Sequence, residues 1–193
     1  MAEVLLLHHA QGLTPGVLEF ADQLRAAGHT VHTPDYYDGK VFDDLNEGVK
    51  YGEEELGMKE ITARCRAAAE ALPTDIVYGG FSMGSVRAQL FAQTRPGAKG
   101  ALLFHGGIAP SWFDSEWPEG VPVQIHTMDK DPWAEMDETN KLVEAAPGTE
   151  LYLYPGDKHL FADSSLPDYD EKAATLLMER VLTFLRRVDQ AGQ

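Results

Sequence analysis

The pentapeptide at residues 80–84 (GFSMG) constrains this chain more than any other stretch. An apolar run at 75–79 precedes it, and a helix-like stretch at 85–95 follows it. Strand, sharp turn and helix, in that order, form the context in which G-x-S-x-G holds a serine hydroxyl clear of the backbone. A Cβ at either glycine would collide with the neighbouring strand or helix. The pattern favours Ser82 as a nucleophile over the alternative, an ordinary glycine-rich turn.

Length and composition describe one globular domain. The chain has 193 residues, of which 44% are hydrophobic and 24% are charged, which predicts a single domain over residues 1–193. The net charge of −15 argues against nucleic acids and anionic membranes as partners. A lone cysteine, Cys65, allows no internal disulfide. No signal or transmembrane segment is recognised, so we expect a cytoplasmic monomer or small homo-oligomer.

Strands and helices alternate along the chain. Residues 4–7 and 101–104 are apolar throughout, which is typical of strands covered on both faces. Further short strands are expected at residues 30–33, 75–79, 121–126 and 151–154. Stretches with helical apolar periodicity separate them. About six strands of this kind predict a mostly parallel sheet in a three-layer α/β/α sandwich. The acidic segment 43–55 is expected to be a solvated loop, and no insertion is large enough for a lid.

In such a sheet the ligand site lies beyond the carboxyl ends of the strands. Loops leaving these ends supply four possible pocket residues: His9, Tyr36, Trp112 and Trp133. Trp112 belongs to an aromatic loop with Phe113 and Trp117. We expect at least one of these three to line the pocket; the alternative is that they cap the core.

A nucleophilic serine needs a histidine base, and the base needs an orienting carboxylate. His159 follows the last predicted strand, and Asp129 and Asp131 both follow the strand before it. The order serine, aspartate, histidine is that of the α/β-hydrolase arrangement, although position alone does not choose between the two aspartates. The helix after Ser82 directs the Met83 N–H at the reacting atoms, where it can stabilise an oxyanion.

Other histidines are weaker candidates. His105 and His126 end strands and could support the pocket. His8 and His9 are adjacent, and neighbouring side chains of an extended segment point to opposite sides, so they are poor joint metal ligands. The sequence therefore predicts no metal site.

Several motifs together resemble the dienelactone hydrolase family of α/β-hydrolases over nearly the whole chain. They lie at residues 4–12, 34–37, 80–84, 125–131 and 154–161. The resemblance implies a compact α/β-hydrolase fold and hydrolysis of an ester or lactone bond in a small acyl substrate, without a cofactor. It also implies that Asp131 is the acid, that His159, with Phe161 two positions later, is the base, and that the Ala10 N–H is the second oxyanion donor.

Three positions depart from that family. Its best-known members have cysteine at Ser82, glutamate at His9 and an arginine that binds the substrate carboxylate at Asp163. With Asp163 near the site and Arg87 expected to face away, we expect neutral acyl substrates to be preferred over carboxylated lactones. Two alternatives stay open: a carboxylesterase or thioesterase for other acyl substrates, and a non-catalytic ligand-binding protein on the same fold.

Overall fold

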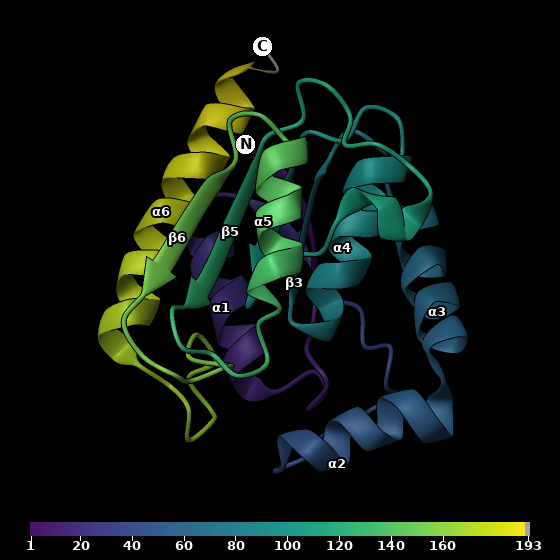
Figure 1. The fold of residues 1–193 in the computed structure, drawn as a ribbon, viewed down its shortest axis with the longest axis vertical. Coiled ribbons are helices and arrows are strands. Elements are labelled where there is room, and N and C mark those ends of the chain that lie inside the picture. Colours follow the sequence, from purple (N-terminus) through teal and green to yellow (C-terminus); the bar gives the residue numbers. More distant parts are fainter. Residues whose placement is uncertain (192–193) are drawn as a thin grey trace.

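A six-stranded parallel sheet forms the centre of the protein in the computed structural model, which describes residues 1–191 (Figure 1). The strand order is β2-β1-β3-β4-β5-β6. The strands are β1 (Glu3–Leu7), β2 (Thr30–His32), β3 (Val77–Phe81), β4 (Gly100–Phe104), β5 (Val123–Met128) and β6 (Glu150–Tyr154). All five pairings are parallel, which confirms the predicted sheet.

Helices cover both faces of the sheet, as the three-layer prediction requires (Figure 1). The helices are α1 (Pro15–Ala26), α2 (Leu45–Lys50), the π-helix η1 (Tyr51–Leu56), α3 (Met58–Glu70), α4 (Met83–Thr94), the 3₁₀-helix η2 (Pro110–Phe113), α5 (Met136–Ala145) and α6 (Glu171–Ala191). Apolar residues of α1 and α6 share one core cluster, and those of α3, α4 and α5 share another. Within residues 1–191, no helix has both the length and the apolar character needed to cross a membrane.

Strand β1 shows why its sequence is apolar throughout. Val4 and Leu6 pack into the cluster on the α1 and α6 face. Leu5 and Leu7 pack into the cluster on the opposite face. Because successive side chains of a strand alternate between faces, a strand covered on both sides needs an uninterrupted apolar run.

The prediction of a solvated loop at residues 43–55 is wrong. Asp44 caps α2 by accepting a hydrogen bond from the Glu47 N–H, 3.0 Å away, and η1 continues the helix. Two glycines let this segment pack closely: a Cβ would lie 2.2 Å from the Ala10 carbonyl oxygen at Gly48 and 2.5 Å from Tyr37 Oη at Gly52. The acidic composition reflects the exposed side of these helices and hid the small residues on the buried side.

His126 lies in the sheet core and gives stability a dependence on pH. Its Nδ1 accepts from Tyr154 Oη and its Nε2–H donates to Gln124 Oε1, both at 2.8 Å. Burial, with a smaller contribution from Arg180, lowers the pKa of His126 to about 3 from the ordinary value of 6.5. The unfolded chain therefore binds a proton below pH 6.5 that the folded chain excludes, so acid favours unfolding.

We predict that His126 alone lowers the free energy of unfolding by about 1.4 kcal/mol for each pH unit between pH 6 and pH 4. Urea unfolding of the wild type and of His126→Gln across this range measures the effect. The variant should show a slope shallower by that amount, and identical slopes would contradict the assignment.

Candidate active site

Ser82 occupies a strained turn between β3 and α4. Its backbone dihedrals, φ 50° and ψ −110°, are rare for a residue with a side chain. Two glycines make the turn possible: a Cβ would lie 2.3 Å from the Gly84 carbonyl oxygen at Gly80, and 2.4 Å from the His8 carbonyl oxygen at Gly84. The Ser82 N–H donates to the Phe104 carbonyl oxygen at 2.8 Å, which ties the turn to β4. The serine hydroxyl is thereby held at the carboxyl edge of the sheet.

A continuous chain of hydrogen bonds runs from this hydroxyl. Ser82 Oγ lies 2.7 Å from His159 Nε2, and His159 Nδ1 lies 2.7 Å from Asp131 Oδ2. Asp131 is 7% exposed, and its other oxygen accepts from the Trp133 N–H at 2.9 Å. Asp129 instead accepts from the Gly156 N–H at 3.0 Å and shapes the turn after β6. Of the two aspartates that the sequence left open, only Asp131 contacts the imidazole.

Two backbone N–H groups flank Ser82. Met83 begins α4, where N–H groups lack an acceptor within the helix. Ala10 follows β1, and its N–H has no acceptor within residues 1–191. Both residues line the same pocket as Ser82. The arrangement can offer two donors to an oxygen bound beside the serine.

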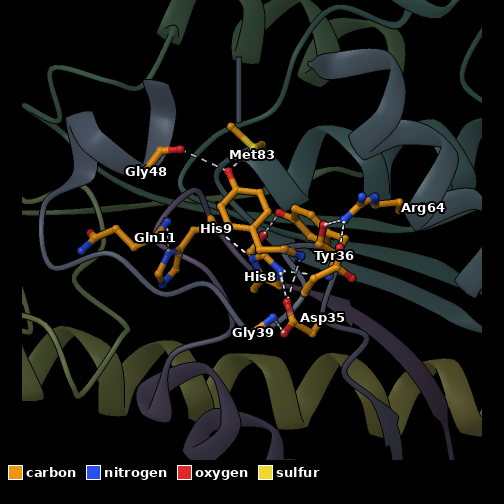
Figure 2. A network of polar contacts seen from close by, with 11 residues as sticks. His8, His9, Gln11, Asp35, Tyr36, Gly39, Gly48, Arg64 and Met83 are labelled. Carbon is orange, nitrogen blue, oxygen red and sulfur yellow. Dashed lines mark hydrogen bonds and ion pairs between the residues drawn. The ribbon is translucent and has the colours of Figure 1, made fainter. Parts of the chain in front are cut away.

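The loop that carries Ala10 is fixed by a polar network (Figure 2). His8 Nδ1–H donates to the His9 carbonyl oxygen at 2.7 Å, and the Gln11 N–H donates to His9 Nδ1 at 3.1 Å. The His8 ring stacks on Tyr36, with centroids 3.6 Å apart, and Tyr36 Oη donates to the His8 carbonyl oxygen. Because backbone and side-chain groups on both sides of Ala10 are bound, the loop has little freedom to turn its N–H away.

A pocket of about 410 Å³ opens beside Ser82. Other side chains on its wall come from α4, the α2–η1 segment, the start of α3 and the segments after β4 and β5: Val49, Glu53, Met58, Val86, Arg87, His105, Ile108, Trp112, Trp133 and Glu135. The Trp133 ring lies 6.0 Å from the His159 ring. Within the aromatic loop, Trp112 lines this pocket, whereas Trp117 is buried in the core and donates to the Val121 carbonyl oxygen at 2.8 Å.

Two of the possible pocket residues lie elsewhere. His9 belongs to the loop after β1 and Tyr36 stacks on His8 of the same loop; both are almost completely buried, and neither lines the pocket. Asp163, expected to border the site, is 1% exposed and is bound to His9 at 2.7 Å. Sequence position identified the loops but not the side to which each side chain turns.

The prediction that Arg87 faces away from the pocket is wrong, because Arg87 lines it. It is 8% exposed, and its Nη1 donates to the Met83 carbonyl oxygen at 3.2 Å. The signal was available in the sequence, because Arg87 follows Met83 by four positions and therefore shares its helix face. Within residues 1–191, no carboxylate pairs with this guanidinium.

His105 also lines the pocket, with a left-handed φ of 71° and a ring 5.5 Å from that of His159. Burial and the neighbouring His159 lower the pKa of His105 well below 6.5, so its ring stays neutral. His126, by contrast, does not reach the pocket. Across residues 1–191, no three histidine, cysteine or carboxylate side chains come together as metal ligands.

Comparison with known proteins assigns the chain to a family. A sequence model of the dienelactone hydrolase family matches residues 1–189. The chain belongs to the dienelactone hydrolase family. This dienelactone hydrolase family member is therefore a hydrolase that acts on ester bonds. A search of curated protein sequences found no significant match.

Solved structures agree with this family member in fold. A dienelactone hydrolase-like promiscuous phosphotriesterase from metagenomic libraries has a TM-score of 0.77 at 18% identity, covering 97% of this chain and 87% of that one. A protein provisionally assigned as a dienelactone hydrolase from Klebsiella pneumoniae has a TM-score of 0.75 at 18% identity, covering 96% and 87%. The dienelactone hydrolase from Anabaena variabilis has a TM-score of 0.71 at 16% identity, covering 97% and 86%.

We predict that Asp131→Asn lowers kcat by a factor on the order of 10³ to 10⁴, because an amide cannot hold the productive imidazole tautomer. Asp129→Asn removes the same charge from the same turn and should stay within a few-fold of wild type. Steady-state kinetics of the two variants, with melting temperatures to verify folding, provide the comparison. A larger loss at Asp129 would reverse the assignment.

Proposed function

We propose that this family member is a serine hydrolase that cleaves an ester or lactone through an acyl-enzyme. The observation that carries the proposal is the hydrogen-bond chain from Ser82 Oγ through His159 to Asp131. A serine held at a strained φ, with a base 2.7 Å from its hydroxyl, fits nucleophilic catalysis.

The proposed reaction has two halves. In the first, Ser82 Oγ attacks the substrate carbonyl while His159 Nε2 takes the hydroxyl proton, and Asp131 stabilises the imidazolium. The N–H groups of Ala10 and Met83 hold the oxyanion. His159 then protonates the departing alkoxide, or the ring oxygen of a lactone. In the second half, His159 activates a water molecule that releases the acyl group and restores Ser82.

The pocket favours small acyl substrates over the long acyl chains of other carboxylesterases or thioesterases. A volume of about 410 Å³ is sufficient for a short ester or a lactone ring. Val49 of α2 and Glu53 of η1 form part of its wall, and the chain has no large insertion that would form a lid over a long acyl chain. A purely ligand-binding protein has no need of an aligned serine, histidine and aspartate, so the binding-module alternative is disfavoured.

One observation favours an anionic substrate as a second candidate. The argument for neutral substrates depended on Asp163, which is buried against His9 rather than exposed in the pocket. The pocket instead contains Arg87, whose guanidinium binds a carbonyl oxygen and the Met58 sulfur. A buried cation without a carboxylate partner can bind an acidic group of the substrate, as a carboxylated lactone would require.

Ser82→Ala should lower kcat at least about 10³-fold on 4-nitrophenyl acetate while the melting temperature stays close to wild type, because the hydroxyl contributes little packing. Labelling with a sulfonyl fluoride, followed by mass spectrometry, should place the adduct on Ser82 in the wild type. Wild-type turnover by Ser82→Ala would show that the elbow is not the nucleophilic site.

Arg87→Met should lower kcat/KM for the 4-nitrophenyl monoester of glutaric acid about 10- to 100-fold more than for 4-nitrophenyl valerate. A hydrogen bond to a charged group contributes about 1.5–3 kcal/mol, which corresponds to this ratio. Arg64→Met is the matched control, because Arg64 pairs with Glu60 and Asp38 outside the pocket. An equal loss of preference for the charged ester in both variants would mean that the overall charge of the protein, rather than a contact with Arg87, attracts the substrate carboxylate.

A further inference from the structure

His9 and Asp163 form a buried pair between two loops of the active site. His9 directly precedes Ala10, and Asp163 follows His159 by four positions. His9 Nε2 lies 2.7 Å from Asp163 Oδ2, although the two residues are 154 positions apart in sequence. Their side chains are both 0% exposed. The contact therefore joins the loop of an oxyanion donor to the loop of the base.

The hydrogen bonds define the charge of each partner. The Gln11 N–H donates to His9 Nδ1, so that nitrogen carries no proton and Nε2–H donates to Asp163. Burial lowers the pKa of His9, which keeps the ring neutral. Burial alone would raise the pKa of Asp163, but hydrogen bonds from His9, Ser165 and Thr14 outweigh it and hold the pKa below its ordinary value. The pair is a neutral imidazole donating to a carboxylate.

Each residue of the pair is also hydrogen-bonded to the backbone of its own loop. His9 fixes the Gln11 N–H through its ring and the Gly12 N–H, 3.0 Å away, through its carbonyl oxygen. Its ring also packs edge-on against Phe81, the residue before Ser82, with centroids 6.3 Å apart. The Asp163 N–H closes a turn with the Leu160 carbonyl oxygen at 3.0 Å, directly after His159.

We infer that His9 and Asp163 are positioning residues that hold the Ala10 N–H and the His159 imidazole in register around Ser82. This inference rests on the proposed serine hydrolase function. Neither side chain reaches the pocket, so the pair acts through the two loops that it joins. The bond from Ala10 to the oxyanion is fully formed only in the transition state, so a shift of the loop lowers kcat more than it raises KM.

Three substitutions test the pair. Asp163→Asn removes the charge, and His9→Asn keeps an acceptor near Nδ1 but is too short to reach Asp163. Both should lower kcat about 10- to 100-fold, with KM within about threefold of wild type. His9→Gln restores a donor near the Nε2 position and should recover most of kcat. The double variant His9→Asn/Asp163→Asn should lose no more than the worse single variant, because the two residues share one interaction.

A second readout distinguishes positioning from a loss of stability. The affinity for a boronic acid, which forms a tetrahedral adduct on Ser82, should fall by the same factor as kcat. His126→Gln is the matched control: it also alters a buried neutral histidine with two side-chain partners, but away from the pocket, and should change stability without changing kcat. Folded His9→Asn and Asp163→Asn variants with wild-type kcat would overturn the inference, as would a parallel loss in His126→Gln.

Ser165→Ala provides a milder test if the Asn variants do not fold. Ser165 Oγ donates to Asp163 Oδ1 at 2.6 Å. Removing this hydroxyl leaves the Asp163 carboxylate less firmly held, while its hydrogen bond from His9 remains. A decrease in kcat of threefold or more at unchanged KM would support the inference, and an unchanged kcat would overturn it. Failure of the proposed function is distinguishable, because the wild type would then be neither active on esters nor labelled at Ser82.

Discussion

The carboxyl edge of the sheet around Ser82 depends on how closely three backbone segments approach one another at the end of β1. A Cβ at Gly84 would lie 2.5 Å from the Leu7 carbonyl oxygen, and one at Gly48 would lie 2.8 Å from the Ala10 carbonyl carbon. The turn at Ser82 and the α2 helix therefore both rest on the strand and loop that lead to Ala10. Since no side chain fits in either contact, the positions of Ser82, Ala10 and the pocket wall are decided by one set of steric limits.

Buried histidines then fix the backbone of the loops at this edge of the sheet. His8, His9, His105 and His126 are all at most 4% exposed. The hydrogen bonds of His8 and His9 hold the backbone of the loop after β1 in one conformation. The cost of burying them is offset because each has a partner at both ring nitrogens. Within the described chain His105 is different: its ring nitrogens have no partner.

Sequence reasoning recovered the features that are local in the chain. The G-x-S-x-G turn, the apolar strands and the order of Ser82, Asp131 and His159 follow from spacing, and the structure places these three side chains in contact. The choice of Asp131 needed the family resemblance, because both aspartates lie in one turn and side-chain direction is not encoded by position alone. The contact between His9 and Asp163 could not be predicted from one sequence, since nothing local marks a partner 154 positions away. The α2–η1 segment was missed because its acidic composition concealed two glycines spaced four apart.

The part of the pocket wall formed by α2 and η1 has a separate significance for how hydrolases of this kind can diversify. Residues 45–56 contribute Val49 and Glu53 to the pocket, yet they supply no atom to the chain of hydrogen bonds through His159. The η1 portion is a π-helix, a form that commonly marks functional sites. Substrate range can therefore drift by exchange of this twelve-residue stretch, provided that its two glycines are retained, while the hydrogen bonds from Ser82 through His159 to Asp131 stay the same.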